Sequence, residues 1–222
     1  MNVFSLNVIK KREGNLNNII PNILKQADIL YINLIGFDNI PKICKHKKIK
    51  INNFKFGGSE LRFFNYNDYI KNDTYYFTID DDIIYPDNYS DILIENMLKY
   101  NNDTVCCVHG SNVDLSKDSK FYEEGKTCFH FKRKLLINTE VLIPGVGTSC
   151  FYTQKCKINI KDFKVKNMSD VYVASFLYKQ NIKIISIKRE EMWLKPLPKI
   201  EPVIWKNNPY KEIDNIINKT FK

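Results

Sequence analysis

The sequence has no long hydrophobic run and no segment typical of protein export. No stretch approaches the roughly 18 uninterrupted apolar residues of a membrane-spanning helix. The first nine residues are too short and too polar to be predicted as a signal peptide. We therefore expect no transmembrane segment, and any contact with a membrane to be peripheral.

Cysteine pairs with metal-binding spacing are also missing. None of the six cysteines forms a C-x-x-C pair, and no His–Cys spacing resembles a zinc site. Two of them, Cys106 and Cys107, lie in an apolar run where a small hydrophobic residue is expected. The pattern predicts reduced thiols and a cytoplasmic location.

Acidic residues are outnumbered by basic ones, 25 to 34, which gives a net charge of +9. A basic chain favours anionic partners, and nucleic acid, an anionic membrane face and phosphorylated substrates all qualify. The basic residues are spread along the chain, with short clusters only at Lys45–Lys50 and Lys132–Lys134. Diffuse lysine and asparagine in an isoleucine-rich chain is equally typical of an AT-rich genome, so charge alone selects no partner.

What is present suffices for a folded domain. Of the 222 residues, 44% are hydrophobic and 13% aromatic, which excludes general disorder. In the first half, apolar patterns predict strands and helices in alternation, typical of a parallel sheet with helices on both faces. The expected strands are 2–9, 29–35, 48–54, 75–79 and 105–108; the expected helices are 15–26, 60–70 and 86–100. Pro21 bends the first helix or begins it, and Ser59 is a plausible N-cap of the second.

The second half is less regular. Residues 111–135 form a long polar connection, which we expect to be functional or mobile. Strands are expected at 139–143, 150–153 and 182–187 and a helix at 170–180, and the tail beyond Pro196 ends in an amphipathic pattern at Ile213, Ile216 and Ile217. No internal repeat is present. We predict one α/β domain over 1–222, with a nucleotide-binding half (1–110), a smaller mixed half (111–195) and a C-terminal tail (196–222).

An aromatic and β-branched strand, Tyr75–Ile79, leads directly into Asp80, Asp81 and Asp82. Adjacent carboxylates repel one another, and burial increases the cost. Along an extended backbone Asp80 and Asp82 point to one side and Asp81 to the other. Two carboxylates plus water suit Mn²⁺ or Mg²⁺ and leave positions for phosphate oxygens. The alternative is an exposed acidic turn ahead of a helix; the apolar strand before the triplet favours the metal site.

The segment Tyr76–Pro86 resembles the D-x-D segment of small GT-A glycosyltransferases from polysaccharide-building bacteria and from large DNA viruses that glycosylate their capsids. Four further segments resemble family segments in the same order: Gln26–Leu34, His109–Gly110, Gly145–Thr148 and Asn167–Asp170. Together the matches cover roughly residues 1–195. The resemblance implies a GT-A fold and an enzyme that moves a sugar from a nucleoside diphosphate-sugar, most simply UDP-linked, to a glycan or glycoprotein acceptor, with inversion.

The resemblance also implies roles for individual residues. Asp82 would ligate Mn²⁺ or Mg²⁺, Asp80 would bind ribose or metal, and Asp81 would lie in the donor site. Asp170 would be the base beside the acceptor hydroxyl. An acid after Ser169 is also favourable in a first helical turn for local reasons alone, so both interpretations of Asp170 stay open.

Six further residues are weaker candidates. By resemblance Arg62 would reach the nucleotide, although the chain departs from the usual Gly-Asp-type turn just before it, and a solvated helix residue is the alternative. Gly145 and Gly147 would let backbone approach a substrate, or form a plain hairpin turn. Arg189 suits a diphosphate by its charge. Trp193 would contact sugar or simply pack, and His109 would face the metal, the acceptor or neither.

Competing functions lack their signatures. A sugar-nucleotide nucleotidyltransferase usually has a glycine-rich basic loop after the first strand, whereas Lys10–Gly14 contains one glycine. A phosphohydrolase would need a hydroxyl residue shortly after a nucleophilic aspartate, where this chain has Ile83 and Ile84. A basic module for RNA or polysaccharide is permitted by charge, but no RNP-like aromatic pair supports it and three clustered aspartates would not serve it. We expect no nucleic-acid partner.

Overall fold

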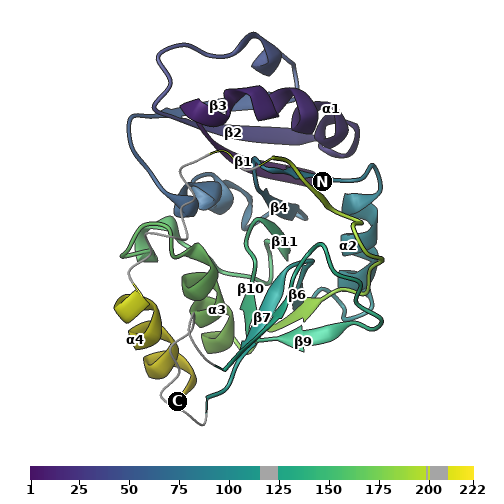
Figure 1. Ribbon diagram of the computed structural model, residues 1–222, viewed down its shortest axis with the longest axis vertical. Helices are drawn as coiled ribbons and strands as arrows, with labels where there is room; N and C mark the ends of the chain where they lie inside the picture. Colours follow the sequence, from purple (N-terminus) through teal and green to yellow (C-terminus); the bar gives the residue numbers. More distant parts are fainter. Residues whose placement is uncertain (116–124, 199, 201–209) are drawn as a thin grey trace.

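The computed structural model describes residues 1–115, 125–198, 200 and 210–222, and its centre is one eight-stranded sheet (Figure 1). The strand order is β3-β2-β1-β4-β11-β6-β12-β9. The bounds are β1 Asn2–Ile9, β2 Ile29–Ile35, β3 Ile49–Phe54, β4 Tyr75–Ile79, β6 Thr104–Cys107, β9 Thr139–Val141, β11 Thr148–Tyr152 and β12 Lys183–Ser186.

The sheet is mostly parallel, as predicted. β1 pairs in parallel with β2 and β4, β2 with β3, and β6 with β12. β11 runs antiparallel between β4 and β6, and β9 is an antiparallel edge strand. The sheet therefore joins strands from both halves of the chain.

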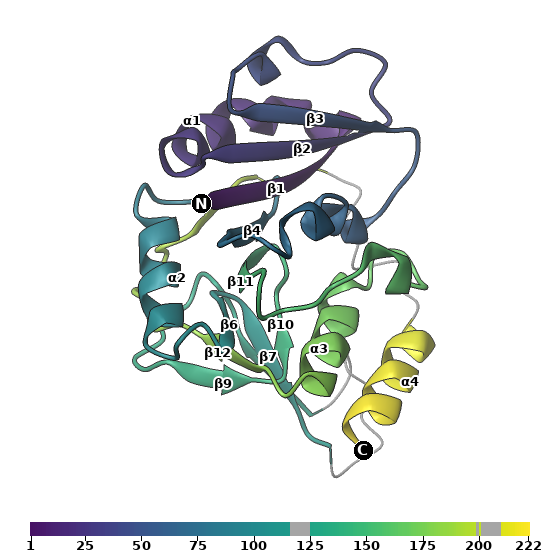
Figure 2. The same ribbon diagram turned by 180° about the vertical axis from the view of Figure 1, so that it is seen from behind.

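Alternation along β1 divides the core into two layers. Phe4, Leu6 and Val8 belong to a buried cluster on one face of the sheet, together with residues of α1 (Leu16–Gln26) and α2 (Tyr89–Leu98). Val3 belongs to a second cluster with residues of α3 (Ser169–Lys179). Successive side chains of a strand point to opposite faces, so both faces of this sheet are covered by helices. Figures 1 and 2 show α1 over one face of β1–β3.

Helix α1 continues through Pro21 and begins at Leu16, so the alternative of a start at Pro21 is wrong. Pro21 is exposed, and it lacks the N–H that an interior helical residue donates. The helix nevertheless buries a stripe at helical spacing: Leu16, Ile19, Ile20 and Ile23. Burial of this stripe offsets the local cost of the proline.

The predicted helix over residues 60–70 is wrong. The chain instead forms two 3₁₀ turns, η3 (Ser59–Phe63) and η4 (Tyr66–Tyr69), and Ser59 is no N-cap. Phe63, Tyr66 and Tyr69 are all buried in the second cluster. Their spacing of three matches the three residues per turn of a 3₁₀ helix, which aligns these side chains on one side. Helix α2 also starts later than predicted, at Tyr89 rather than Pro86.

The predicted polar connection 111–135 contains a hairpin. β7 (Gly110–Val113) pairs with β8 (Lys126–Phe129) and with β10 (Ile143–Pro144), which makes a three-stranded sheet. Residues 116–124 of that connection lie outside the described residues. The remaining short elements are β5 (Ile83–Ile84), β13 (Lys195–Pro196), η1 (Lys10–Asn15), η2 (Lys42–Cys44) and η5 (Ile160–Asp162).

The C-terminal amphipathic pattern forms helix α4 (Tyr210–Phe221), which lies beside α3 in both views (Figures 1 and 2). Ile213, Ile217 and Phe221 pack in a third buried cluster with Val171 of α3. Residues 199 and 201–209 of the predicted tail lie outside the described residues. None of the described helices combines the length and apolar surface needed to span a bilayer. All six cysteines lie in the described residues and are free thiols.

Candidate active site

The acidic triplet lies where two neighbouring strands end. β4 ends at Ile79, directly before Asp80, and the adjacent parallel strand β1 ends at Ile9. Parallel strands place their carboxyl ends at one edge of a sheet, where α/β proteins bind ligands. η1 follows β1 and brings Arg12 to the triplet.

Arg12 binds two of the three aspartates. Its Nη1 donates to Asp81 Oδ1 at 2.7 Å and to Asp82 Oδ2 at 3.3 Å. The chain turns at Asp81 and Asp82, so the alternation of an extended strand does not continue through the triplet. Burial by itself would lower the pKa of Arg12, but the charges of Asp81, Asp82 and Asp80 outweigh it and raise that pKa.

Asp81 is the buried member of the triplet, 7% exposed. Burial raises the pKa of its carboxyl group, and the Arg12 guanidinium opposes that rise. Asn15 Nδ2 donates to the Asp81 carbonyl at 2.8 Å, which fixes the backbone of the turn. The structure therefore directs Asp81 into the protein.

Asp80 is paired with Arg62, one of the predicted nucleotide-binding residues. Arg62 comes from η3, and its Nη2 donates to Asp80 Oδ1. Its Nε also donates to the Ile79 carbonyl at 3.0 Å. Arg62 is thus bound to the end of β4 and is no freely solvated residue.

The Gly145–Gly147 turn packs against the triplet. It is no hairpin, because β10 pairs with β7 while β11 enters the main sheet. A side chain at Gly147 would bring its Cβ to 1.9 Å from Asp80 Oδ2, so glycine is needed for this arrangement of the turn and the carboxylate. Tyr85 joins the two segments: its hydroxyl accepts from the Asp80 N–H at 2.8 Å and donates to the Gly147 carbonyl at 2.6 Å.

The same turn connects the triplet to Asp170, at the start of α3. The Val146 N–H donates to Asp170 Oδ1 at 2.9 Å, and Thr78 of β4 donates to the Val146 carbonyl. Desolvation raises the pKa of Asp170 to about 6. The hydrogen bond from the Val146 N–H opposes this rise, and the charge of Asp80 adds to it. Solvent still reaches Asp170, which is exposed as a residue.

Asp80 and Asp82 fit an incomplete metal site. Their side chains are 33% and 37% exposed. In each, one oxygen faces an arginine, and within the described residues the other accepts no hydrogen bond.

Three carboxylates face two guanidinium groups, so net negative charge remains. Burial and the charges of Asp80 and Asp81 raise the pKa of Asp82 to about 6. Hard cations prefer such oxygen ligands.

The described residues do not complete such a site by themselves. Across the described residues, no group of three His, Cys, Asp or Glu side chains is arranged to hold a metal ion. Water and a bound molecule with oxygen donors would supply further ligands to a cation at Asp80 and Asp82.

Among solved structures, the chain is similar to GalNAc-T7, in a crystal structure with UDP, GalNAc and Mn²⁺. The TM-score is 0.67 at 8% sequence identity, over 98% of this chain and 47% of that chain. The fold is similar to the GT-A fold. The chain spans about half the length of this neighbour. No family model matches the sequence, and no curated protein matches it either.

Arg189 lies outside the carboxylate site in this GT-A-like fold. It is 5% exposed, and its Nη2 donates to the carbonyls of Phe129 and His130 at 2.9 and 3.0 Å. Its Nη1 donates to Ser186 and Ile187. These partners occupy the groups with which Arg189 was expected to bind diphosphate, so we leave it out of the proposed donor site.

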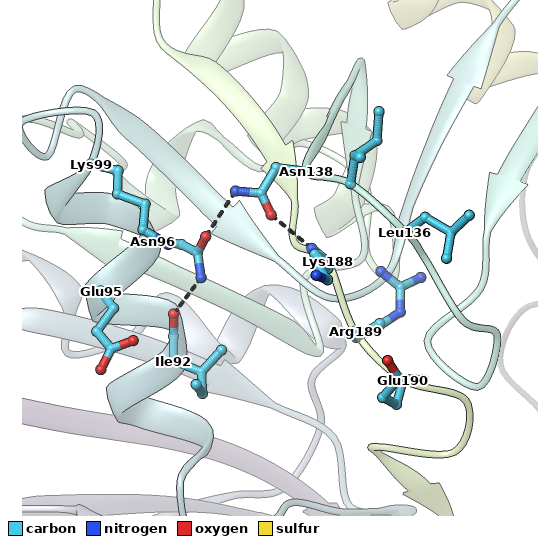
Figure 3. Close-up of a pocket in the computed structure, with 10 residues that line it drawn as sticks. Ile92, Glu95, Asn96, Lys99, Leu136, Asn138, Lys188, Arg189 and Glu190 are labelled. Atoms are coloured by element: carbon cyan, nitrogen blue, oxygen red, sulfur yellow. Dashed lines mark hydrogen bonds between the residues drawn. The ribbon is translucent and has the colours of Figure 1, made fainter.

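Arg189 instead lines a separate cavity of about 560 Å³ between α2 and two loops (Figure 3). Asn138 Nδ2 donates to Asn96 Oδ1, and the Lys188 N–H donates to Asn138 Oδ1, each at 2.8 Å (Figure 3). Among the described residues, those that line this cavity include none of the triplet.

His109 and Trp193 pack against other side chains. The His109 ring lies 5.1 Å from the His130 ring and its Nε2 lies 3.7 Å from Cys128 Sγ. Burial and the charge of His130 lower the pKa of His109 to about 3, so the ring is neutral near pH 7. The Trp193 ring lies 6.0 Å from that of Tyr89, which supports the packing interpretation.

Two residues of the site escaped sequence reasoning. The sequence places Arg12 only in a loop unsuited to triphosphate, and the pairing of β1 with β4 that brings it to the triplet is visible only in the structure. Tyr85 was noted only as part of the D-x-D segment. Its role depends on the Gly145–Gly147 turn, about 60 positions later in the sequence, and the sequence alone carries no sign of that contact.

Proposed function

We propose that this chain is a metal-dependent glycosyltransferase that moves a sugar from a nucleoside diphosphate-sugar, UDP-linked, to a glycan acceptor with inversion. One observation carries the proposal. Asp80 and Asp82 keep open carboxylate oxygens at the carboxyl edge of the sheet, and one glycine turn lies between Asp80 and Asp170 and contacts both. Similarity to a fold seen with UDP and Mn²⁺ in GalNAc-T7 supports it.

Asp80 and Asp82 are the residues that would hold Mn²⁺ or Mg²⁺. When bound, the ion would neutralise charge on the departing diphosphate. Arg12 and Arg62 hold the aspartates in place in its absence, since each is within reach of one of them. Asp81 serves this site through its buried pair with Arg12 rather than as a ligand.

Asp170 is the proposed base. The acceptor hydroxyl oxygen forms a bond to the anomeric carbon, the bond from that carbon to the diphosphate oxygen breaks, and the hydroxyl proton passes to the Asp170 carboxylate. A base works best when its pKa lies near the working pH, and a pKa of about 6 meets that condition. Gly147 has no side chain, which lets its turn pack directly against the Asp80 carboxylate.

The test is a panel of nucleotide-sugars in which nucleotide release is measured with Mn²⁺, with EDTA, and with and without saccharide acceptors. We expect metal-dependent release from one donor and its stimulation by an acceptor. Asp82→Asn removes the charge that binds the cation, so release should fall at least about 100-fold while the circular dichroism spectrum stays unchanged.

Asp87→Asn is the matched control, because Asp87 lies five positions away in an exposed pair with Lys25. It should keep wild-type release. Undiminished release by Asp82→Asn would remove the metal assignment. Release by no donor on the panel, from folded protein, would remove the proposed function.

A further inference from the structure

Two distant segments of the chain meet beside the proposed site. Residues 58–60 begin the η3 turn that carries Arg62, and residues 167–169 lead into helix α3, which carries Asp170. They are about 108 positions apart in the sequence and are joined by hydrogen bonds in both directions.

The bonds are reciprocal. Asn167 Oδ1 accepts from the Ser59 N–H at 3.1 Å, and Glu60 Oε2 accepts from the Asn167 N–H at 3.3 Å. Ser59 Oγ accepts from the Ser169 N–H at 3.4 Å, one residue before Asp170. Glu60 Oε1 also accepts from the Gly58 N–H at 3.0 Å, which holds the carboxylate in place.

The backbone at this junction requires particular residues. Asn167 has φ +61°, a left-handed conformation that asparagine and glycine adopt more readily than other residues. A Cβ on Gly58 would lie 2.6 Å from both Asn167 Oδ1 and Glu60 Oε2. Glycine at 58 is therefore needed for the two segments to approach this closely.

The sheet holds the other side of the same turn. Asn7 Nδ2 of β1 donates to the Gly58 carbonyl at 2.9 Å, and Asn33 Nδ2 of β2 donates to the Leu61 carbonyl at 3.0 Å. Asn33 is fully buried. The η3 turn is thereby fixed to the sheet. The hydrogen bonds between residues 58–60 and 167–169 in turn fix the start of α3 relative to η3.

We infer that Asn167 and Glu60 are positioning residues that set the distance from the Asp80–Arg62 pair to Asp170. The inference rests on the proposed function. Both residues act through backbone groups of neighbouring segments, so they affect where the base stands relative to the donor. Loss of either should lower kcat for sugar transfer and leave KM for the donor nearly unchanged, because a displacement of about 1 Å can cost 100-fold in rate.

Asn167→Gly is the decisive variant, because glycine keeps the left-handed backbone and removes the Oδ1 acceptor. We expect kcat to fall about 10- to 100-fold, with donor KM within about twofold of wild type. Asn167→Asp retains an oxygen at that position and should recover most of the rate. Asn181→Gly is the matched control, since Asn181 has φ +56°, is exposed and lies just beyond the other end of α3.

Hydrogen exchange supplies a readout that is independent of activity. The Ser59 amide should exchange faster in Asn167→Gly and at the wild-type rate in Asn181→Gly. Unchanged exchange at Ser59, or wild-type kcat in an active Asn167→Gly, would overturn the inference. A wild-type protein that releases nucleotide from no donor would instead overturn the proposed function, and the positioning role of Asn167 with it.

Discussion

At the scale of single residues, Arg12 and Arg62 explain how three adjacent carboxylates are tolerated. Each arginine hydrogen-bonds with at least one aspartate, and the most buried of the three, Asp81, lies 2.7 Å from Arg12. Removing one partner of a buried pair leaves an uncompensated charge, which is costly. The remaining negative charge is at Asp80 and Asp82, the two with exposed oxygens, and there a cation would relieve it.

Gly147→Ala tests the contact of the turn with Asp80. The new Cβ would lie 1.9 Å from Asp80 Oδ2, so either the turn or the carboxylate must move. We expect metal-dependent nucleotide release to fall at least about 10-fold, a loss of about 1.4 kcal/mol or more of transition-state stabilisation. The control is Gly14→Ala, because a Cβ at Gly14 meets no atom within 4 Å. Wild-type release by Gly147→Ala would show that Asp80 need not keep this position.

The raised pKa of Asp170 predicts a pH profile. A base must be ionised, so kcat for transfer should rise with pH and level off above about pH 6. Asp170→Asn should lose this rising limb, and its rate at pH 7.5 should be at least about 100-fold lower. Asp162 is an exposed residue of η5 and provides the control, because Asp162→Asn should keep the wild-type pH profile of kcat. A profile that rises through pH 6 in Asp170→Asn would assign the titration to another group.

The same shift has a consequence for stability. Between the ordinary value of 3.8 and about 6 the folded state binds more protons at Asp170 than the unfolded state does. The free energy of unfolding therefore loses a contribution from Asp170 as the pH rises through this window. Asp170→Asn lacks this pH-dependent loss. The Tm of Asp170→Asn minus the Tm of wild type should therefore be larger at pH 7.5 than at pH 4.5. An unchanged difference in Tm would mean that the carboxylate is not destabilised by folding.

The sequence alone indicated the aspartates of the site but not their arginine partner Arg12, because that contact depends on strand pairing. Asp80 and Asp82 were recognisable because a run of carboxylates after an apolar strand needs an explanation. Arg189 was selected by charge alone, and charge does not reveal that backbone carbonyls occupy its guanidinium group. Arg12 was passed over because its partners are about 70 positions away and are brought near only by the pairing of β1 with β4.

At the scale of elements, the expected strands of the first half followed the apolar pattern closely. The expected strand 139–143 instead divides between β9 and β10, and the expected helix 60–70 forms two 3₁₀ turns. A strand of the central sheet is buried on both faces and reads as a continuous apolar run. In η3 and η4, buried aromatics at spacing three suit a 3₁₀ turn as well as an α-helix. In the 3₁₀ form, the rings of Phe63 and Tyr66 both pack against Phe151 of β11.

Helix α4 offers a test of how firmly the C-terminal residues belong to the domain. Ile217 is fully buried against α3, so Ile217→Ala should lower the free energy of unfolding by about 2–4 kcal/mol. Ile216, on the same helix, is only partly buried, and Ile216→Ala should cost clearly less. Urea denaturation measures both. If Ile217→Ala lowered the free energy of unfolding no more than Ile216→Ala does, α4 would not depend on the packing of Ile217 against α3.

At the scale of the whole molecule, the antiparallel strand β11 joins the two halves of the chain. It lies between β4, which leads into the triplet, and β6, and it follows directly on the Gly145–Gly147 turn. Because β11 occupies this central position, the turn before it lies at the edge where β4 ends. The alternating pattern of the first half predicted a parallel sheet but contained no information on where a later antiparallel strand would enter.

The sequence by itself determined the α/β class, most of the strands and the acidic triplet, because these depend on local apolar periodicity and on charge repulsion between neighbours. Only the tertiary structure decided that Arg12, Arg62, Gly147 and Asp170 meet around that triplet. Each of these contacts joins residues that lie 18 to 70 positions apart in the sequence. Such contacts depend on strand order and register, which local patterns do not encode.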